Sequence, residues 1–259
     1  MPMSLSFEQC GAGIGAAWTV LREHAARAGL GAEVPTCPGW VVRDLVAHQG
    51  MVHRWAAWVV RGDEPGDTTA VEQEGRGSGD VLGWLDEGVT ALLSALAFAP
   101  DDLGGPFFLK DAPAPKLAWA RRQCHETTMH AVDAMSASLG RTPTGRETWV
   151  DAALAADGVD ELLCGFVPRR REQLRSASPR TVVVEASDTG HSWTLQISEA
   201  PVVTTAYAPG VRAPRPEGAT VLTGTAAQLY LGLWNRGDEI ESSGPDLLAD
   251  WRRHMAVSW

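Results

Sequence analysis

A glutamate and two histidines stand close together in the segment RRQCHETTMHAVDA, residues 121–134. If this segment is a helix, His125 and His130 point about 140° away from each other, so they cannot bind the same ion. Glu126 and His130 differ in direction by only about 40°, so they lie on one face of the helix. This pair could share a divalent metal ion, but an open catalytic site normally has three protein ligands. A third ligand must therefore come from another element.

The best candidate for the third ligand is His48. It lies in a helix expected from about residue 41 to residue 61, after the turn TCPGW. On a helical wheel His48 falls within an apolar stripe, which faces the core. The other members of the stripe are Val41, Leu45, Val52, Trp55 and Val59. Metal sites in helical bundles are built from side chains of facing helices, and two imidazoles with one carboxylate suit a zinc ion with an open coordination position.

Other readings of these residues stay open. A histidine in an apolar stripe can simply be a hydrogen-bonded core residue. Glu126 and His130 can be a solvated pair, with Arg121 or Arg122 as ion-pair partners.

Three further residues could form hydrogen bonds to the three candidate ligands. His125 is close enough in the sequence to donate a hydrogen bond there. Asp44 and Asp133 lie one helical turn from His48 and His130, and each could orient the neighbouring imidazole. The alternative for both aspartates is a plain solvated carboxylate.

Four segments could position these side chains. Residues 5–28, 41–61, 80–98 and 115–139 have apolar positions at helical spacing and are bounded by glycine or proline. Four helices of this length predict a helical bundle. The polar segment 62–79 between the second and third helices is expected to be a long loop, either functional or mobile.

The pattern changes after the segment RTPTGRET. Residues 149–175 still favour a helix, but RTVVVEAS, SWTLQIS, PVVTTAYA and ATVLTG predict strands, and helices are expected at about 225–235 and 245–256. Strands with helices on one side indicate an α+β fold. We therefore expect two domains, a bundle over residues 1–142 and a smaller α+β domain over residues 143–259.

Composition narrows the class of partner. The chain of 259 residues is 44% hydrophobic, which is enough for globular cores, and its formal net charge is −10 with no basic run. These features argue against nucleic acid and anionic membranes as partners and favour small molecules. No basic, apolar leader opens the sequence, no apolar stretch is long enough to span a membrane, and the four cysteines form no C-x-x-C pair. We expect a cytoplasmic protein with reduced cysteines.

The segments VPTCPGWVVRDLVAHQGMVHRWA and RRQCHETTMHAVDA resemble the DinB-like, metal-binding N-terminal domain of the mycothiol-dependent maleylpyruvate isomerase family of actinobacteria. The segments DTGHSWTLQI, ATVLTGTAAQLYLGLWNRG and SSGPDLLADW resemble the C-terminal domain of that family, a small sterol-carrier-like α+β fold. The resemblance covers nearly the whole chain. It implies a bundle that binds Zn²⁺, or another divalent metal, through His48, Glu126 and His130. It also implies that Arg236 of LWNRG reaches the catalytic cleft.

The activity implied by the resemblance uses mycothiol as a thiol cosubstrate. The metal would lower the pKa of the thiol, because the thiolate is the nucleophile. An isomerase would add the thiolate to a conjugated cis double bond and eliminate it after rotation, whereas an S-transferase would release the adduct. Arg236 would pair with a substrate carboxylate.

Two other functions remain possible on the same scaffold. One is a zinc-dependent hydrolase that uses metal-bound water. The other is a non-catalytic metal- or ligand-binding or regulatory protein. The substrate and the oligomeric state are not determined by the sequence.

Overall fold

The computed structural model describes residues 5–64, 66–105, 107–109, 112–169 and 174–255. The chain forms two compact units. The helical unit comprises Ser6–Phe107 and Pro113–Pro143, and the mixed unit comprises Met1–Leu5, Phe108–Ala112 and Thr144–Trp259. Two short pieces of the mixed unit therefore precede residue 142, where the sequence predicts a single boundary.

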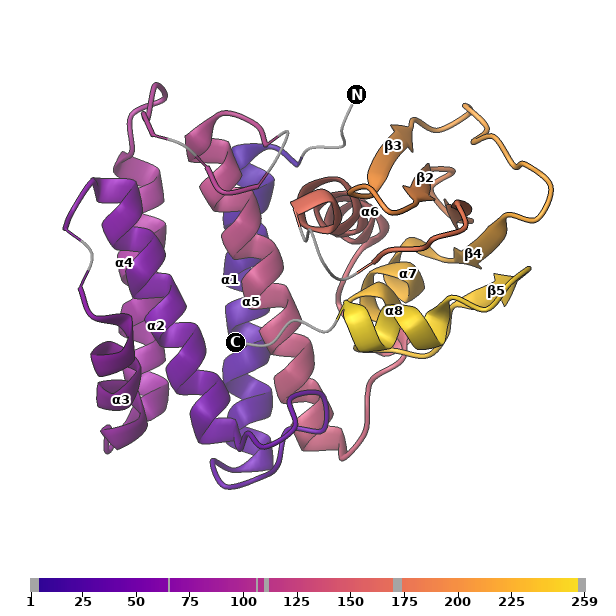
Figure 1. Ribbon diagram of the computed structural model, residues 1–259. Helices are drawn as coiled ribbons and strands as arrows, with labels where there is room; N and C mark the ends of the chain where they lie inside the picture. The colour runs from indigo at the N-terminus through magenta and orange to yellow at the C-terminus, as the bar shows by residue number, and fades with distance from the viewer. Residues whose placement is uncertain (1–4, 65, 106, 110–111, 170–173, 256–259) are drawn as a thin grey trace. The chain divides into compact units, whose positions relative to one another are not determined.

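The helical unit contains α1 (Phe7–Ala28), α2 (Val42–Arg61), α3 (Thr68–Gly77), α4 (Val81–Phe98) and α5 (Pro115–Leu139). Helix α1 packs along α5, and α2 packs along α4 and also contacts α5 (Figure 1). The helices α1, α2, α4 and α5 confirm the four predicted helices and the bundle.

Local signals in the sequence set the ends of these helices. Ser6 and Gln9 form a capping box at the start of α1, and proline occupies the first turn of α5. Helices α2 and α5 end at Gly62 and Gly140, whose φ angles of 73° and 68° are left-handed. Glycine adopts this conformation without a steric penalty, which is why both helices stop there.

The segment 62–79 is not the continuous loop that the sequence predicts, because it contains α3. The Asp67 carboxylate begins this helix by accepting hydrogen bonds from the backbone N–H groups of Thr69 and Ala70. Gly75 then lets α3 lie close to α4, since a Cβ atom at this position would overlap the Trp84 ring. The segment was predicted to be a loop because it is polar. Its short helix is amphipathic and is stabilised by packing.

The apolar stripe predicted on α2 is only partly correct. Leu45, His48 and Val52 are buried, but Val59 is 37% exposed. Towards the C-terminal end of α2 the buried side chains are Ala56, Ala57 and Val60 instead. The buried face of α2 rotates along the helix because its neighbouring helices, and not the angles of an ideal helical wheel, decide which side chains are buried.

A buried polar cluster joins α2 to α5 in the core of the bundle. Nε2 of His53 lies 2.7 Å from Nε2 of Gln49 and 2.9 Å from Oγ1 of Thr127. The Thr127 hydroxyl donates to the carbonyl of Gln123. Burial lowers the pKa of His53 from its ordinary value of 6.5 to about 3, so the ring is neutral in the folded protein at neutral pH.

This lowered pKa makes stability depend on pH. Between about pH 6.5 and pH 3 the unfolded chain binds a proton at His53 that the folded chain does not, so acidification favours unfolding. We expect His53 to contribute a loss of about 2 kcal/mol in the free energy of unfolding between pH 7 and pH 5. Urea denaturation at both pH values should show a smaller loss for His53→Gln, while the same substitution at the exposed His254 should leave the pH dependence as in the wild type.

The mixed unit begins with α6 (Ala152–Asp160), which continues as a π-helical turn, Glu161–Phe166, and a 3₁₀ turn, Val167–Arg169. The helix predicted over residues 149–175 is thus shorter and irregular at its end, and residues 170–173 of that prediction lie outside the described residues. The strands are β1 (Arg180–Ala186), β2 (Ser192–Ile197), β3 (Val203–Tyr207), β4 (Thr220–Gly224) and β5 (Glu241–Ser243). Helices α7 (Ala226–Leu233) and α8 (Leu248–His254) complete the unit.

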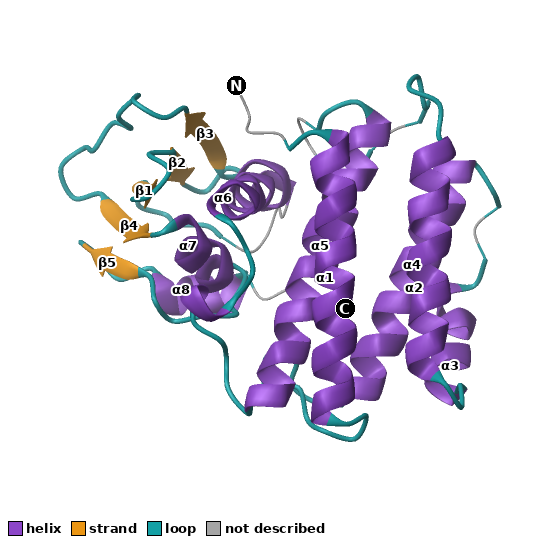
Figure 2. Cartoon of the chain, turned by 180° about the vertical axis from the view of Figure 1, so that it is seen from behind, coloured by secondary structure: helices purple, strands orange, loops and turns teal. Residues whose placement is uncertain are grey.

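The strands form one sheet in the order β3-β2-β1-β4-β5. Strands β1 and β4 are parallel, and the other neighbours are antiparallel. Helices α6 and α7 lie on one side of this sheet (Figures 1 and 2). The predicted α+β class is confirmed, and the predicted strands correspond to β1, β2, β3 and β4. Strand β5 was missed because its three exposed residues, Glu-Ser-Ser, carry no alternating pattern.

Among the described helices, α4 alone has the length and hydropathy of a membrane span. Leu85, Val89 and Leu92 of this helix are almost fully buried inside the helical unit, whereas Phe98 at its end is 88% exposed. A core helix of a globular bundle can have the same composition.

Candidate metal centre

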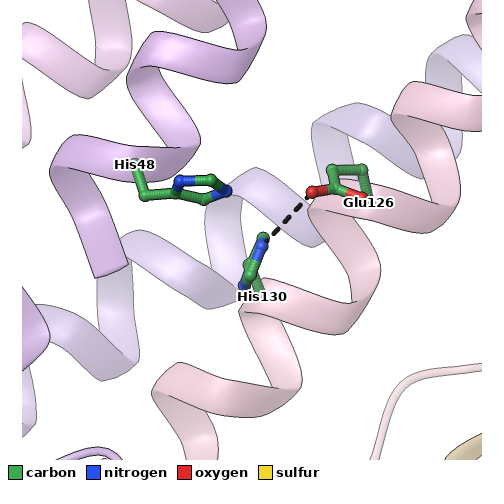
Figure 3. Close-up of side chains that lie close together, drawn as sticks. All are labelled: His48, Glu126 and His130. Carbon is green, nitrogen blue, oxygen red and sulfur yellow. Dashed lines mark ion pairs between the residues drawn. The ribbon is translucent and has the colours of Figure 1, made fainter. Parts of the chain in front are cut away.

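His48, Glu126 and His130 meet inside the helical unit. His48 comes from α2, and Glu126 and His130 come from adjacent turns of α5 (Figure 3). One ligand atom of each residue lies within 4.8 Å of the corresponding atoms of the other two, and all three residues are buried. Nε2 of His130 is 3.3 Å from Oε1 of Glu126. The structure therefore brings together the three residues that helical geometry selects.

The dimensions of this cluster fit a divalent metal ion. Zinc binds imidazole nitrogen and carboxylate oxygen at about 2.0–2.2 Å, so two of its tetrahedral ligands are about 3.3–3.6 Å apart. The separation between His130 and Glu126 already has this value. Oε1 of Glu126 is a buried atom, and its neighbour is Nε2 of His130, so these two atoms could bind the same ion. A small inward movement of the side chains would complete a three-ligand site.

The charge state of Glu126 suits a metal ligand. Burial alone would raise the pKa of this carboxyl, but the neighbouring His130 ring and the Arg122 guanidinium outweigh burial and lower it to about 2. Nη2 of Arg122 donates to Oε2 of Glu126 at 2.8 Å. Glu126 is therefore ionised at neutral pH, with one oxygen on Arg122 and the other directed to His130.

The two histidines differ in their charge state. Burial, with a smaller effect from His130, lowers the pKa of His48 to about 4, so His48 is neutral at pH 7. A neutral imidazole is the form that binds metals. Burial also opposes protonation of His130, but the carboxylates of Asp133 and Glu126 raise its pKa overall. A metal ion would have to displace a proton from His130, because both bind the same nitrogen lone pair.

Asp133 lies beside His130, as its spacing on the helix predicts. Its Oδ2 is 3.0 Å from Nδ1 of His130 and also accepts a hydrogen bond from the Cys37 thiol at 3.4 Å. A carboxylate on Nδ1 fixes the orientation of the ring and leaves Nε2 facing the cluster. The geometry is the one expected for a residue that orients a metal-binding histidine.

Asp44 makes its hydrogen bond and its ion pair near the start of α2 and with α3. Its Oδ2 accepts a hydrogen bond from the backbone N–H of Val41 at the start of α2, and its Oδ1 lies 3.3 Å from Nη1 of Arg76. An aspartate in the first turn of a helix reaches back to the free N–H groups more easily than forward to a side chain in the next turn. The carboxylate beside His48 belongs to Glu72 of α3, with Oε2 3.7 Å from Nδ1.

Glu72 was missed because its segment was predicted to be a loop. Two signals could have identified the helix that carries it. Asp67 stands at the position of an N-cap residue, and Glu72 and Arg76 are spaced as an i, i+4 ion pair, which the structure shows at 2.7 Å.

Trp40 of the turn TCPGW also borders the cluster. Its ring centroid lies 5.1 Å from that of His48 and 6.4 Å from that of His130. Gly39, with a φ angle of 87°, turns the chain immediately before it. Trp40 is half-buried, so it contributes an apolar wall beside the two imidazoles.

The remaining candidate residues lie outside this cluster. His125 is fully buried on α5 and is not one of the three clustered residues. Arg236 belongs to the mixed unit, where it follows α7 directly after Asn235, whose φ angle of 61° reverses the chain. The Arg236 side chain is buried, and its Nη1 donates to the carbonyl of Trp234 at 2.8 Å.

Comparison with known proteins identifies the relatives of the chain. Residues 12–135 match the family model of the mycothiol maleylpyruvate isomerase N-terminal domain, and residues 153–250 match that of the MDMPI C-terminal domain. A search among curated proteins gave no match.

Solved structures support the same assignment of the fold. The crystal structure of the mycothiol-dependent maleylpyruvate isomerase is 16% identical to the chain, with a TM-score of 0.61, and the alignment covers 94% of this chain and 95% of the other. A histidine-to-alanine mutant of that enzyme is 15% identical, with a TM-score of 0.63 and the same coverage. This chain thus follows the fold of that enzyme over 94% of its length. The chain belongs to the mycothiol-dependent maleylpyruvate isomerase family.

Proposed function

We propose that the chain is a metal-dependent enzyme, with zinc as the expected ion and a low-molecular-weight thiol, first of all mycothiol, as cosubstrate. Its substrate would be a small electrophile that is isomerised or receives the thiol by S-transfer. The observation that carries the proposal is the buried cluster of His48, Glu126 and His130 in a chain of this family. Mycothiol itself is suggested by the name of the solved relative.

His48, Glu126 and His130 would hold the ion. When bound, zinc would supply a positive charge that lowers the pKa of a thiol and so favours the nucleophilic thiolate. Glu126 is the only anionic ligand of the three, so two neutral imidazoles and one carboxylate would leave one net positive charge on a divalent ion. Burial of these ligands excludes water and strengthens their electrostatic effect on a bound thiol.

Asp133 would keep the His130 ring in place through Nδ1, at 3.0 Å. Arg236 is proposed to bind a carboxylate of the substrate, because a guanidinium forms two parallel hydrogen bonds with a carboxylate. This role for Arg236 rests on the family and not on its contacts within the mixed unit.

We also propose that the protein acts in the cytoplasm. All four cysteines are present as thiols, which suits a reducing compartment.

Purified protein should contain about one zinc ion per chain, and the zinc-loaded protein should convert maleylpyruvate or another small electrophile only when mycothiol is present. Isomerisation would regenerate the thiol, whereas S-transfer would consume one thiol for each product molecule, so a thiol assay separates the two reactions.

Hydrolysis without added thiol would favour the use of metal-bound water. Metal binding without turnover of any electrophile, together with tight binding of an apolar ligand, would contradict the proposal and favour a carrier.

A further inference from the structure

The side of His48 that faces away from the cluster is next to a carboxylate from another helix. Oε2 of Glu72 lies 3.7 Å from Nδ1 of His48, whose side chain is 6% exposed, whereas that of Glu72 is 21% exposed. The other ring nitrogen, Nε2, is a fully buried atom. This separation is longer than a hydrogen bond, and a small rotation of the Glu72 side chain would bring it to hydrogen-bonding distance, about 2.7–3.2 Å.

The second histidine of the cluster has the same arrangement. His130 has Asp133 at Nδ1 and Glu126 at Nε2, at 3.0 Å and 3.3 Å. Each imidazole therefore has a carboxylate beside Nδ1, and His130 directs Nε2 to the third ligand. Metal-binding histidines usually donate the N–H that faces away from the ion to such an acceptor, which fixes both the tautomer and the direction of the ring.

The contacts of α3 fix the position of Glu72. Nη2 of Arg76 lies 2.7 Å from Oε1 of Glu72, and Nη1 lies 3.3 Å from Asp44. Nη1 of Arg43 on α2 donates to the carbonyls of Arg76 and Ser78 at the end of α3. Arg76 therefore occupies one oxygen of Glu72, and the other oxygen faces His48.

We propose that Glu72 is a positioning residue for His48: it accepts the Nδ1 proton and thereby directs the Nε2 lone pair into the cluster. This inference rests on the proposed metal centre. It gives α3 a role in the site, since Glu72 belongs to this helix.

Zinc affinity measured by competition with a chromophoric chelator tests this role. Removing an acceptor of this kind weakens metal binding by about 10- to 100-fold, and we expect a loss of this size for Glu72→Ala. Glu72→Gln should recover part of the affinity, because its amide oxygen can still accept the Nδ1 proton. Glu74→Ala is the matched control, since Glu74 lies on the same helix with an exposed side chain, and it should bind zinc as the wild type does.

A second variant separates positioning from simple docking of α3. Arg76→Ala removes the ion pairs with Glu72 and Asp44 but keeps the Glu72 carboxylate, and Arg43 can still hold the end of α3 through the backbone carbonyls of residues 76 and 78. If Glu72 acts on His48, Arg76→Ala should change zinc affinity by less than about threefold. If Arg76→Ala weakens binding as much as Glu72→Ala, the effect comes from docking of α3, and the proposal is wrong.

The visible spectrum of the Co²⁺-substituted protein gives a readout that does not depend on activity. A reoriented His48 changes the ligand field, so the bands should shift in Glu72→Ala and not in Glu74→Ala. Wild-type affinity and an unchanged spectrum in Glu72→Ala would overturn the role of Glu72 but leave the metal centre intact. Failure of the wild type to bind zinc or cobalt would instead overturn the proposed function itself.

Discussion

Replacement of His48 by alanine should remove zinc from the protein without unfolding it. The variant keeps Glu126 and His130, but two protein ligands rarely hold a catalytic divalent ion. Loss of a direct ligand should lower zinc affinity more than loss of the hydrogen-bond acceptor Glu72, so we expect the affinity to fall by more than about 100-fold. Thiol-dependent activity should fall with it.

Thermal denaturation with and without zinc measures this loss directly. An ion that binds only the folded state stabilises it by about 4 kcal/mol at a concentration 1,000 times its Kd. Zinc should therefore raise the Tm of the wild type and leave that of His48→Ala almost unchanged. His191→Ala, a histidine substitution in the mixed unit, should respond to zinc as the wild type does. Full zinc occupancy in His48→Ala would exclude His48 as a ligand.

His48 is a better test position than Glu126. Glu126 also forms a buried ion pair with Arg122, and breaking such a pair typically costs about 3–5 kcal/mol. Loss of zinc from Glu126→Ala could then reflect partial unfolding. The charged neighbour of His48 is Glu72, which is partly exposed, and the buried α2 residues Leu45 and Ala47 keep the helix packed.

Gly158→Ala should destabilise the mixed unit strongly. Gly158 is buried in α6, and a Cβ atom there would overlap the ring of Tyr230, which is fully buried on α7. An enclosed ring cannot move aside freely, so we expect a loss of about 3 kcal/mol or more in the free energy of unfolding. For a chain of this size such a loss lowers Tm by roughly 6–12 °C, which circular dichroism can measure.

The control for this variant is Gly15→Ala in α1. Gly15 also lies inside a helix, but a Cβ atom there meets nothing within 4 Å. Alanine favours the helix over glycine by about 0.5–1 kcal/mol, so Gly15→Ala should be neutral or slightly stabilising. If both variants were equally stable, the close approach of α6 to α7 at Tyr230 would not be a tight contact.

The residues of α5 show how much of the site local sequence can predict. Glu126 and His130 share a face because they are four residues apart in a helix, and Asp133 lies beside His130 because it is one turn further along. These relations follow from helical geometry alone. The capping and stop signals at Ser6, Gly62 and Gly140 similarly made the long helices predictable.

Relations between elements could not be predicted in this way. Asp44 was a candidate to orient His48. In the structure it accepts a hydrogen bond from the backbone at the start of α2, and the carboxylate 3.7 Å from His48 belongs to Glu72, in a segment predicted to be a loop. Helix α3 depends on its contacts with α2 and α4, including the close fit of Gly75 to Trp84. A short polar helix carries little signal of its own, because packing provides most of its stability.

The sequence by itself determined the long helices, the α+β class and the pairing of Glu126 with His130, because each depends on residues within a few turns of one another. Only the tertiary structure decided the distance from His48 to that pair and the carboxylate that stands behind His48. Both depend on how α2, α3 and α5 pack. This packing is set by side chains far apart in the chain, so a local sequence pattern cannot predict it.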